Sequence, residues 1–197
     1  GRSVLNWVLI NGESEFGVTV HYIDEGIDTG DIIKQKLYKI SNDDDYASLL
    51  KRATYYCANL IDESLKDICS NTVKKVKQKS IDIKGSYFKL RKPGDETIDW
   101  NQSNKQIMNF TRALVFPGPY AHTRLQSGEA IKIIKISEFK NSNFDNKYLP
   151  GTIVGFEGFS PLTKTSDGIL KIDKYILDGN HNKELIKFTK VGSKFSF

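Results

Sequence analysis

The sequence has few cysteines and no long apolar run, and both absences exclude whole classes of protein. Its two cysteines, Cys57 and Cys69, are too few for a disulfide framework and lack the Cys-x-x-Cys spacing of metal sites. They lie in one expected helix, about 18 Å apart along its axis, which is beyond the reach of a disulfide. No segment approaches the roughly 20 apolar residues of a membrane-spanning helix, and no basic-then-apolar leader opens the chain. These absences predict a reduced, cytoplasmic protein.

The composition that remains is that of a globular protein. Hydrophobic residues make up 39%, charged residues 27% and aromatic residues 11% of the 197 positions. An intrinsically disordered chain would hold fewer aromatic and β-branched residues, and this length accommodates one ordinary domain or two small ones. The chain opens at Gly1 rather than at a methionine, so we expect a processed, trimmed or engineered start with a segment before it.

Positive charge is concentrated in one short stretch, which we call the basic connector (residues 71–92). The whole chain has a formal net charge of +5. The basic connector has Asp82 as its acidic residue, and its basic residues are Lys74, Lys75, Lys77, Lys79, Lys84, Lys89, Arg91 and Lys92. Such a stretch is either a solvated linker or a surface for phosphate groups.

Hydrophobic periodicity predicts two helices and two strands before the basic connector. Helical spacing covers residues 2–10, and a β-rich run follows at 18–23. A polar, glycine-bearing loop at 24–31 leads into a strand at 32–40 and then into a helix over 41–69. A parallel sheet needs several βαβ units, so this α/β part is expected to be the second half of a larger fold.

The remainder of the chain predicts one helix and a series of short strands. Ser103 is a candidate N-cap for a helix that extends to Leu114. Turn signals then separate expected strands at 120–125, 131–139, 151–156, 169–177 and 185–191. This pattern is typical of a small β-barrel, so we expect an α/β part followed by a β-barrel.

Five segments of the sequence stand out as motifs: GRSVLNWVLINGE at 1–13, GVTVHYIDEGIDTGDII at 17–33, RKPGDETIDW at 91–100, TRAL at 111–114 and PGPYA at 117–121. With these motifs the chain resembles the formyltetrahydrofolate-dependent formyltransferases, a family that includes methionyl-tRNA formyltransferase and the sugar N-formyltransferases. The resemblance implies an α/β fold in which residues 1–86 are the C-terminal half of a Rossmann-like domain plus the basic connector. Residues 87–197 would then be a small OB-like β-barrel.

Within this family the chain resembles the sugar branch more than the tRNA branch. Leu5-Asn6-Trp7 and Asn11-Gly12-Glu13 follow the sugar version, whereas Val4 departs from the usual proline. The resemblance implies formyl transfer from N10-formyltetrahydrofolate to the amino group of a dTDP- or UDP-linked amino-deoxy sugar, for surface polysaccharides such as lipopolysaccharide O-antigen. It implies no metal and no nucleic-acid partner, and the apolar strands of the second domain favour a homodimer.

The family's catalytic signature, Asn-x-His-x-Ser-Leu-Leu-Pro, does not occur in this sequence. The resemblance gives the oxyanion contact to that asparagine and general-base work to that histidine. Asp28 matches the third catalytic residue, a carboxylate that orients the imidazole and favours its protonated form. The alternative for Asp28 is a loop residue in an Asx-type turn before Gly30. Without its histidine this fragment is expected to be inactive.

The resemblance also assigns binding residues. Asp24, Glu25, Gly26 and Ile27 match the loop that contacts the pterin, which can approach closely beside a glycine, although a plain turn is the alternative. Arg2 matches a folate-contacting arginine, with a surface arginine as the alternative.

The amino-sugar residues are expected between the two domains. Arg91 and Arg112 are candidates for the diphosphate, and Tyr87 and Tyr120 are candidates to stack on a nucleobase or line the cleft. We set His21 aside as a structural histidine because its position is not the family's catalytic one.

Two other readings stay open. Methionyl-tRNA formyltransferase would use the basic connector and the barrel for the tRNA acceptor arm, with binding that weakens steeply as salt rises. A non-catalytic module would bind oligonucleotide or sugar on the barrel alone.

Overall fold

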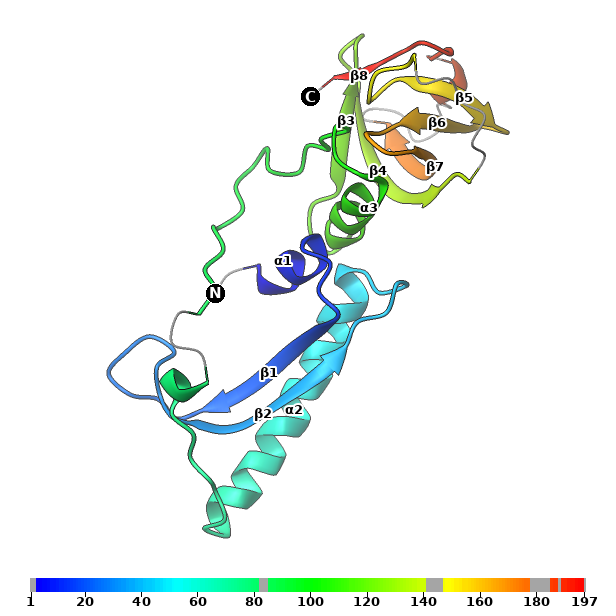
Figure 1. Cartoon of the computed structure of the whole chain (residues 1–197). Helices are drawn as coiled ribbons and strands as arrows, with labels where there is room; N and C mark the ends of the chain where they lie inside the picture. Colours follow the sequence, from blue (N-terminus) through cyan, green and yellow to red (C-terminus); the bar gives the residue numbers. More distant parts are fainter. Residues whose placement is uncertain (1–2, 82–84, 141–146, 178–184, 188, 197) are drawn as a thin grey trace. The chain divides into compact units, whose positions relative to one another are not determined.

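The computed structural model describes residues 3–81, 85–140, 147–177, 185–187 and 189–196. Arg2 therefore lies outside the described residues. The chain divides into two compact units, the first formed by residues 1–8 and 13–90 and the second by residues 9–12 and 91–197 (Figure 1). Helix α1 (Val4–Ile10) contributes to both units, and each unit has its own secondary structure.

The first unit is a two-stranded antiparallel hairpin with one long helix along it (Figure 1). Strand β1 (Glu15–His21) pairs with β2 (Ile32–Lys39), and α2 (Tyr46–Cys69) packs on them. Phe16 and Val18 alternate on the buried face of β1, as a half-buried strand requires. Strand β1 begins earlier than the sequence predicted, because Phe16 packs near the rings of Tyr38 and Tyr56.

Helix α2 begins at a well-formed N-terminal cap. Asp45 is the N-cap, and its side chain and that of Ser48 form a reciprocal capping box, so the helix begins at Tyr46, five residues after the predicted start at Ser41. Asp44 lies just outside the helix and pairs with Arg52 at 2.6 Å. Burial raises the pKa of Asp44. The backbone N–H of Ser41, the Ser48 hydroxyl and Arg52 outweigh this effect and hold the pKa of Asp44 below that of an ordinary aspartate.

The basic connector returns to the hairpin before it reaches the second unit. Val76 and Ile32 exchange two backbone hydrogen bonds of 2.8 and 3.1 Å, which form an isolated antiparallel bridge. A short 3₁₀ helix, η1 (Gln78–Ser80), follows directly. This bridge fixes the start of η1 beside the loop that joins β1 to β2.

The second unit combines helix α3 (Asn104–Ala113) with a strongly curled antiparallel sheet (Figure 1). The order in the sheet is β5 (Ile153–Glu157), β6 (Ser160–Lys164), β7 (Ile169–Leu177), β4 (Ala130–Glu138), β3 (Ala121–Leu125) and β8 (Phe195–Ser196). A bridge between Thr152 and Lys194 links the two ends of this sheet. Trp100 is fully buried and stacks on Phe195 with ring centroids 5.4 Å apart.

Three details of the second unit differ from the expected strands. Strand β6 was not predicted because it is short and contains Pro161, which cannot donate to a ladder. The strand predicted over 185–191 is wrong. Residues Leu185–Lys187 form the 3₁₀ helix η2, and the Leu185 N–H donates to the Tyr175 hydroxyl at 2.8 Å instead of to a strand. Strand β8 was too short to predict.

The helix after Ser103 is confirmed. Ser103 caps α3 and forms a capping box with Gln106. Within the described part of the chain, no helix is long and apolar enough to cross a membrane.

Candidate functional site

The loop between β1 and β2 (residues 24–30), which we call the Asp28 loop, is an ordered turn with its own hydrogen bonds. The Tyr22 N–H donates to the Asp31 carbonyl at 2.9 Å and closes the loop at its base. One oxygen of Asp24 accepts from the Gly26 N–H at 3.0 Å and from the Thr29 hydroxyl at 2.6 Å. The Thr29 and Gly26 donors lower the pKa of Asp24, so its carboxylate stays charged while it holds the turn.

Asp28 stands at the far end of this loop in an unusual backbone conformation. Its φ of +54° lies in the left-handed region, which aspartate tolerates better than most residues. Its side chain remains 75% exposed. Two residues further on, a Cβ on Gly30 would lie 1.7 Å from the Tyr22 carbonyl oxygen, so glycine is required there for close approach. The loop therefore presents the Asp28 carboxylate on a strained but defined turn.

His21 lies beside Asp28, a neighbour that the sequence analysis did not identify. The imidazole Nε2 is 3.8 Å from the Asp28 carboxylate, and Nδ1 is 2.8 Å from the Tyr22 carbonyl. Because a carbonyl only accepts, Nδ1 must donate, which leaves Nε2 facing the carboxylate. The pairing register shifts between Val20 and His21, and such irregularities re-aim side chains at strand ends. The signal in the sequence was a histidine at the end of a strand, seven residues before Asp28.

The remaining residues of the loop offer both apolar and polar surface. Ile27 is 91% exposed, and Ile23, just before the loop, is 95% exposed. Glu25 and Gly26 are exposed as well. Ligand sites combine apolar side chains with a few polar groups, and this loop offers both. Among the described residues, no group of His, Cys, Asp and Glu is arranged to hold a metal.

A second set of aromatic residues lies at the end of the first unit. The Trp7 indole N–H donates to the Lys89 carbonyl at 3.0 Å, and the Trp7 ring stacks on Phe88 at 5.5 Å between centroids. Tyr87 is 95% exposed, so its ring is available to a ligand. Trp7 therefore anchors the chain directly next to this exposed tyrosine.

The predicted acceptor-binding residues of the second unit are partly buried. Arg91 is 9% exposed; its guanidinium donates to the Asp95 carbonyl at 2.7 Å and lies 5.7 Å from the Phe110 ring centroid. Arg112 is half-buried and donates from Nε to the Asn109 side-chain oxygen at 3.1 Å, while Tyr120 is half-buried. These contacts hold the Arg91 guanidinium against Asp95 and Phe110 within the second unit.

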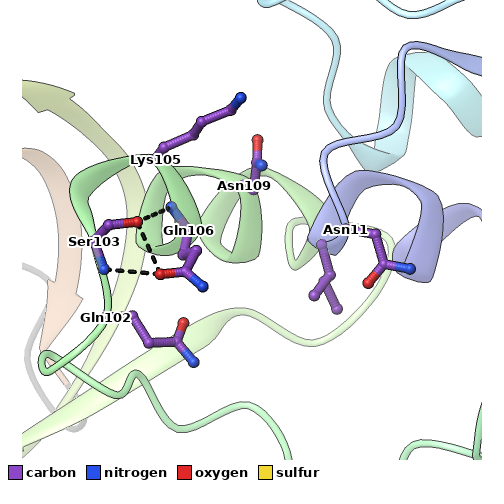
Figure 2. A pocket seen from close by; sticks show the side chains of 7 residues that line it. Asn11, Gln102, Ser103, Lys105, Gln106 and Asn109 are labelled. Carbon is purple, nitrogen blue, oxygen red and sulfur yellow. Dashed lines mark hydrogen bonds between the residues drawn. The ribbon is translucent and has the colours of Figure 1, made fainter.

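A pocket of about 380 Å³ lies at the N-terminal end of α3 (Figure 2). The Gln106 side-chain oxygen accepts from both the backbone and the hydroxyl of Ser103, as the dashed lines in Figure 2 indicate. The residues that line the pocket are Ile10, Asn11, Gln102, Ser103, Lys105, Gln106 and Asn109. The sequence analysis named none of them as a candidate site residue. Much of this pocket is therefore the cap of α3.

The structure brings one set of the predicted residues together. One loop of the first unit contains Asp24, Glu25, Gly26, Ile27 and Asp28. Tyr87 also lies in the first unit, outside this loop. Arg91, Arg112 and Tyr120 lie in the second unit.

Two family models match the chain. Residues 1–62 match the formyl transferase model, and residues 91–190 match the model of the formyl transferase C-terminal domain. The chain therefore belongs to the formyl transferases, a class of enzymes.

Its relatives include members of more than one branch. The chain is 40% identical over 156 residues to the bifunctional polymyxin resistance protein ArnA of Wigglesworthia glossinidia brevipalpis, covering 79% of this chain and 23% of that protein. It is 34% identical over 179 residues to the methionyl-tRNA formyltransferase of Geobacter metallireducens, covering 91% of this chain and 55% of that enzyme. The chain thus spans about half the length of this tRNA formyltransferase.

A solved structure of the sugar branch is also similar. It is an N-formyltransferase from Helicobacter canadensis, solved in complex with folinic acid and dTDP-3-aminofucose. The TM-score is 0.63 at 26% identity, and the match covers 88% of this chain and 61% of that one.

Proposed function

We propose that the protein to which this chain belongs transfers a formyl group from N10-formyltetrahydrofolate to the amino group of a nucleotide-linked amino-deoxy sugar, for surface polysaccharide biosynthesis. The observation that carries this proposal is the Asp28 loop. It lies within the match to the formyl transferase model and presents a carboxylate beside an imidazole and exposed apolar side chains. The similarity to a dTDP-aminofucose formyltransferase supports the sugar as acceptor.

The proposed reaction needs few groups from this chain. The acceptor amine forms a bond to the formyl carbon, the bond from that carbon to folate N10 breaks, and the amine proton moves to N10. In our proposal Asp28 orients the histidine that carries this proton, a histidine implied by the family resemblance and not contained in these residues. Asp24, Glu25, Gly26 and Ile27 bind the pterin, and Arg2 supports the folate.

For the acceptor we propose binding through the aromatic and basic candidates. Tyr87 would stack on the nucleobase, and its exposure supports this role. Arg112 and Tyr120 would contact the diphosphate and line the site. Arg91 is the second candidate for the diphosphate, and its guanidinium contacts Asp95 and Phe110.

We propose for the wider architecture that residues 1–86 are the second half of a Rossmann-like domain and residues 87–197 an OB-like domain, in a homodimer. The bridge between Thr152 and Lys194, which links the two ends of the curled sheet, supports a barrel. Analytical ultracentrifugation tests the dimer.

The second candidate function is formylation of methionyl-tRNA, and a specific observation favours it. The tRNA formyltransferase of Geobacter metallireducens matches 91% of this chain at 34% identity, and the basic connector offers charge for a phosphate backbone. The two functions differ in their acceptors, so one assay separates them.

The experiment uses the protein expressed from its complete reading frame, with N10-formyltetrahydrofolate and three acceptors: a dTDP-amino sugar, a UDP-amino sugar and methionyl-tRNA. We expect formylation of a nucleotide sugar and a fall in kcat of at least about 100-fold in Asp28→Asn. Asp62→Asn is the matched control, because Asp62 pairs with Lys66 on the surface of α2. Formylation of methionyl-tRNA alone would favour the second candidate, and full activity of Asp28→Asn would refute the role of Asp28.

A further inference from the structure

Gln78, in the basic connector, contacts the Asp28 loop from a position fifty residues further along the chain. Its side-chain N–H₂ group donates to the Asp28 carbonyl at 2.8 Å and to the Gly30 carbonyl at 2.8 Å. A carboxamide nitrogen has two hydrogens, so one side chain satisfies both carbonyls at once. Gln78 is half-buried, whereas Lys77 and Lys79 on either side are exposed.

The position of Gln78 beside the Asp28 loop is fixed by the backbone. The two hydrogen bonds between Val76 and Ile32 attach the basic connector to the first residue of β2, directly after the Asp28 loop. Gln78 follows two residues later and opens η1. The side chain therefore starts from an anchored segment, which lowers the conformational entropy that its two hydrogen bonds must overcome.

The two carbonyls that Gln78 binds lie at the strained residue, Asp28, and two residues after it. Asp28 has a φ of +54°, a conformation that persists only where surrounding structure holds it. Fixing the carbonyl of Asp28 and that of Gly30 fixes the peptide planes that follow these two residues. It also limits the directions in which the Asp28 carboxylate can point.

We propose that Gln78 is a positioning residue for Asp28: its carboxamide holds the loop in the left-handed turn that presents the carboxylate. This inference rests on the proposed function, because positioning matters for the rate only if Asp28 acts in formyl transfer. Misplacement of a reacting or orienting group by about 1 Å can lower a rate by about 100-fold. Gln78 touches neither reacting atom and acts through Asp28.

The test compares Gln78→Glu, which keeps the shape and removes the donors, and Gln78→Leu with the matched control Gln35→Leu. Gln35 donates to the Thr19 hydroxyl across the same hairpin, away from the loop. The first measurement is amide hydrogen exchange of Tyr22 and Gly26, whose N–H groups are hydrogen bonded within the loop region. We expect exchange at least about fivefold faster in both Gln78 variants and unchanged in the control.

The second measurement is the kinetics of the protein expressed from its complete reading frame. We expect kcat to fall about 10- to 100-fold in Gln78→Glu, while KM for the amino sugar changes less than about twofold. A purely structural role would lower the melting temperature and the amount of active enzyme, and would leave kcat per active site unchanged.

The outcomes separate the two proposals. If Asp28→Asn is inactive and both Gln78 variants match the unmodified protein in kcat and in exchange, the role of Gln78 is overturned and that of Asp28 stands. If no nucleotide sugar is formylated, the proposed function fails, whatever the exchange rates of the Gln78 variants. If formylation occurs and Asp28→Asn is fully active, the role of Asp28 fails, and the positioning role of Gln78 fails with it.

Discussion

Replacing Gly30 by alanine is the most direct test of how the Asp28 loop is built. A Cβ at this position would lie 1.7 Å from the carbonyl oxygen of Tyr22 and 2.6 Å from its carbonyl carbon, where ordinary contacts begin at 3.4 Å. Both atoms belong to the backbone, so no side-chain rotation relieves the overlap. Gly30 does not have a positive φ, and the cost is therefore steric.

The overlap predicts a large effect on both stability and activity. Overpacking of this kind costs about 1–3 kcal/mol, which corresponds to a fall in melting temperature of roughly 5–20 °C for a unit of this size. The Tyr22 carbonyl also accepts the hydrogen bond from His21 Nδ1 at 2.8 Å, so its displacement moves His21 relative to Asp28. We expect kcat to fall about 100-fold even at temperatures where the variant is folded.

The control for this substitution is Gly17→Ala on β1. A Cβ on Gly17 would lie 3.0 Å from the end of the Leu37 side chain, which is 62% exposed and can rotate away. We expect this variant to have a melting temperature equal to or slightly above that of the unmodified protein. Circular dichroism gives the melting temperatures and steady-state kinetics gives kcat. Equal values for Gly30→Ala and Gly17→Ala in both assays would refute the close-approach argument.

Three further predictions concern stability. Asp44→Asn should cost about 1–2 kcal/mol near pH 7 in unfolding curves. The fold lowers the pKa of Asp44, so its contribution is full above the ordinary pKa of an aspartate and is lost as the pH falls through the lower folded value; the difference from the unmodified protein should therefore shrink in acid. Leu60→Ala should cost about 2–5 kcal/mol in urea denaturation because Leu60 is 1% exposed, whereas Ile61→Ala, at a site 50% exposed, should cost less than half as much. Trp100→Phe should cost about 1–3 kcal/mol, since it removes the indole hydrogen bond to a threonine hydroxyl of β3, and an unchanged unfolding midpoint would contradict this.

Local signals in the sequence were sufficient for the long elements and for the family. Ser103 predicted the cap of α3, and the apolar periodicity after the acidic run at 43–45 predicted α2 as far as Cys69. The motifs at 17–33 and 91–100 predicted a formyltransferase, and the family is confirmed. Each of these signals depends on neighbouring residues, whose influence on the backbone is short-ranged.

The sequence alone did not decide which side of an element is covered. The apolar stripe of α2 includes both Leu60 and Leu65, yet packing against the hairpin buries Leu60 and leaves Leu65 55% exposed. Likewise, the sequence predicted a strand over 185–191, whereas residues 185–187 form a 3₁₀ helix. The Leu185 N–H donates to the Tyr175 hydroxyl, a partner that the sequence pattern does not reveal. Burial is a property of contacts between segments, which periodicity does not specify.

The residues around Asp28 illustrate the same division. The family resemblance predicted a functional loop at 24–30, whereas the contacts of His21 and Gln78 with that loop emerge only in the tertiary structure. The first depends on a shift of register in the hairpin, and the second on a bridge between residues 32 and 76. The sequence by itself determined the family and the residue types of the loop. The tertiary structure decided which distant side chains hold that loop, because hydrogen bonds between remote segments form only when the chain has folded.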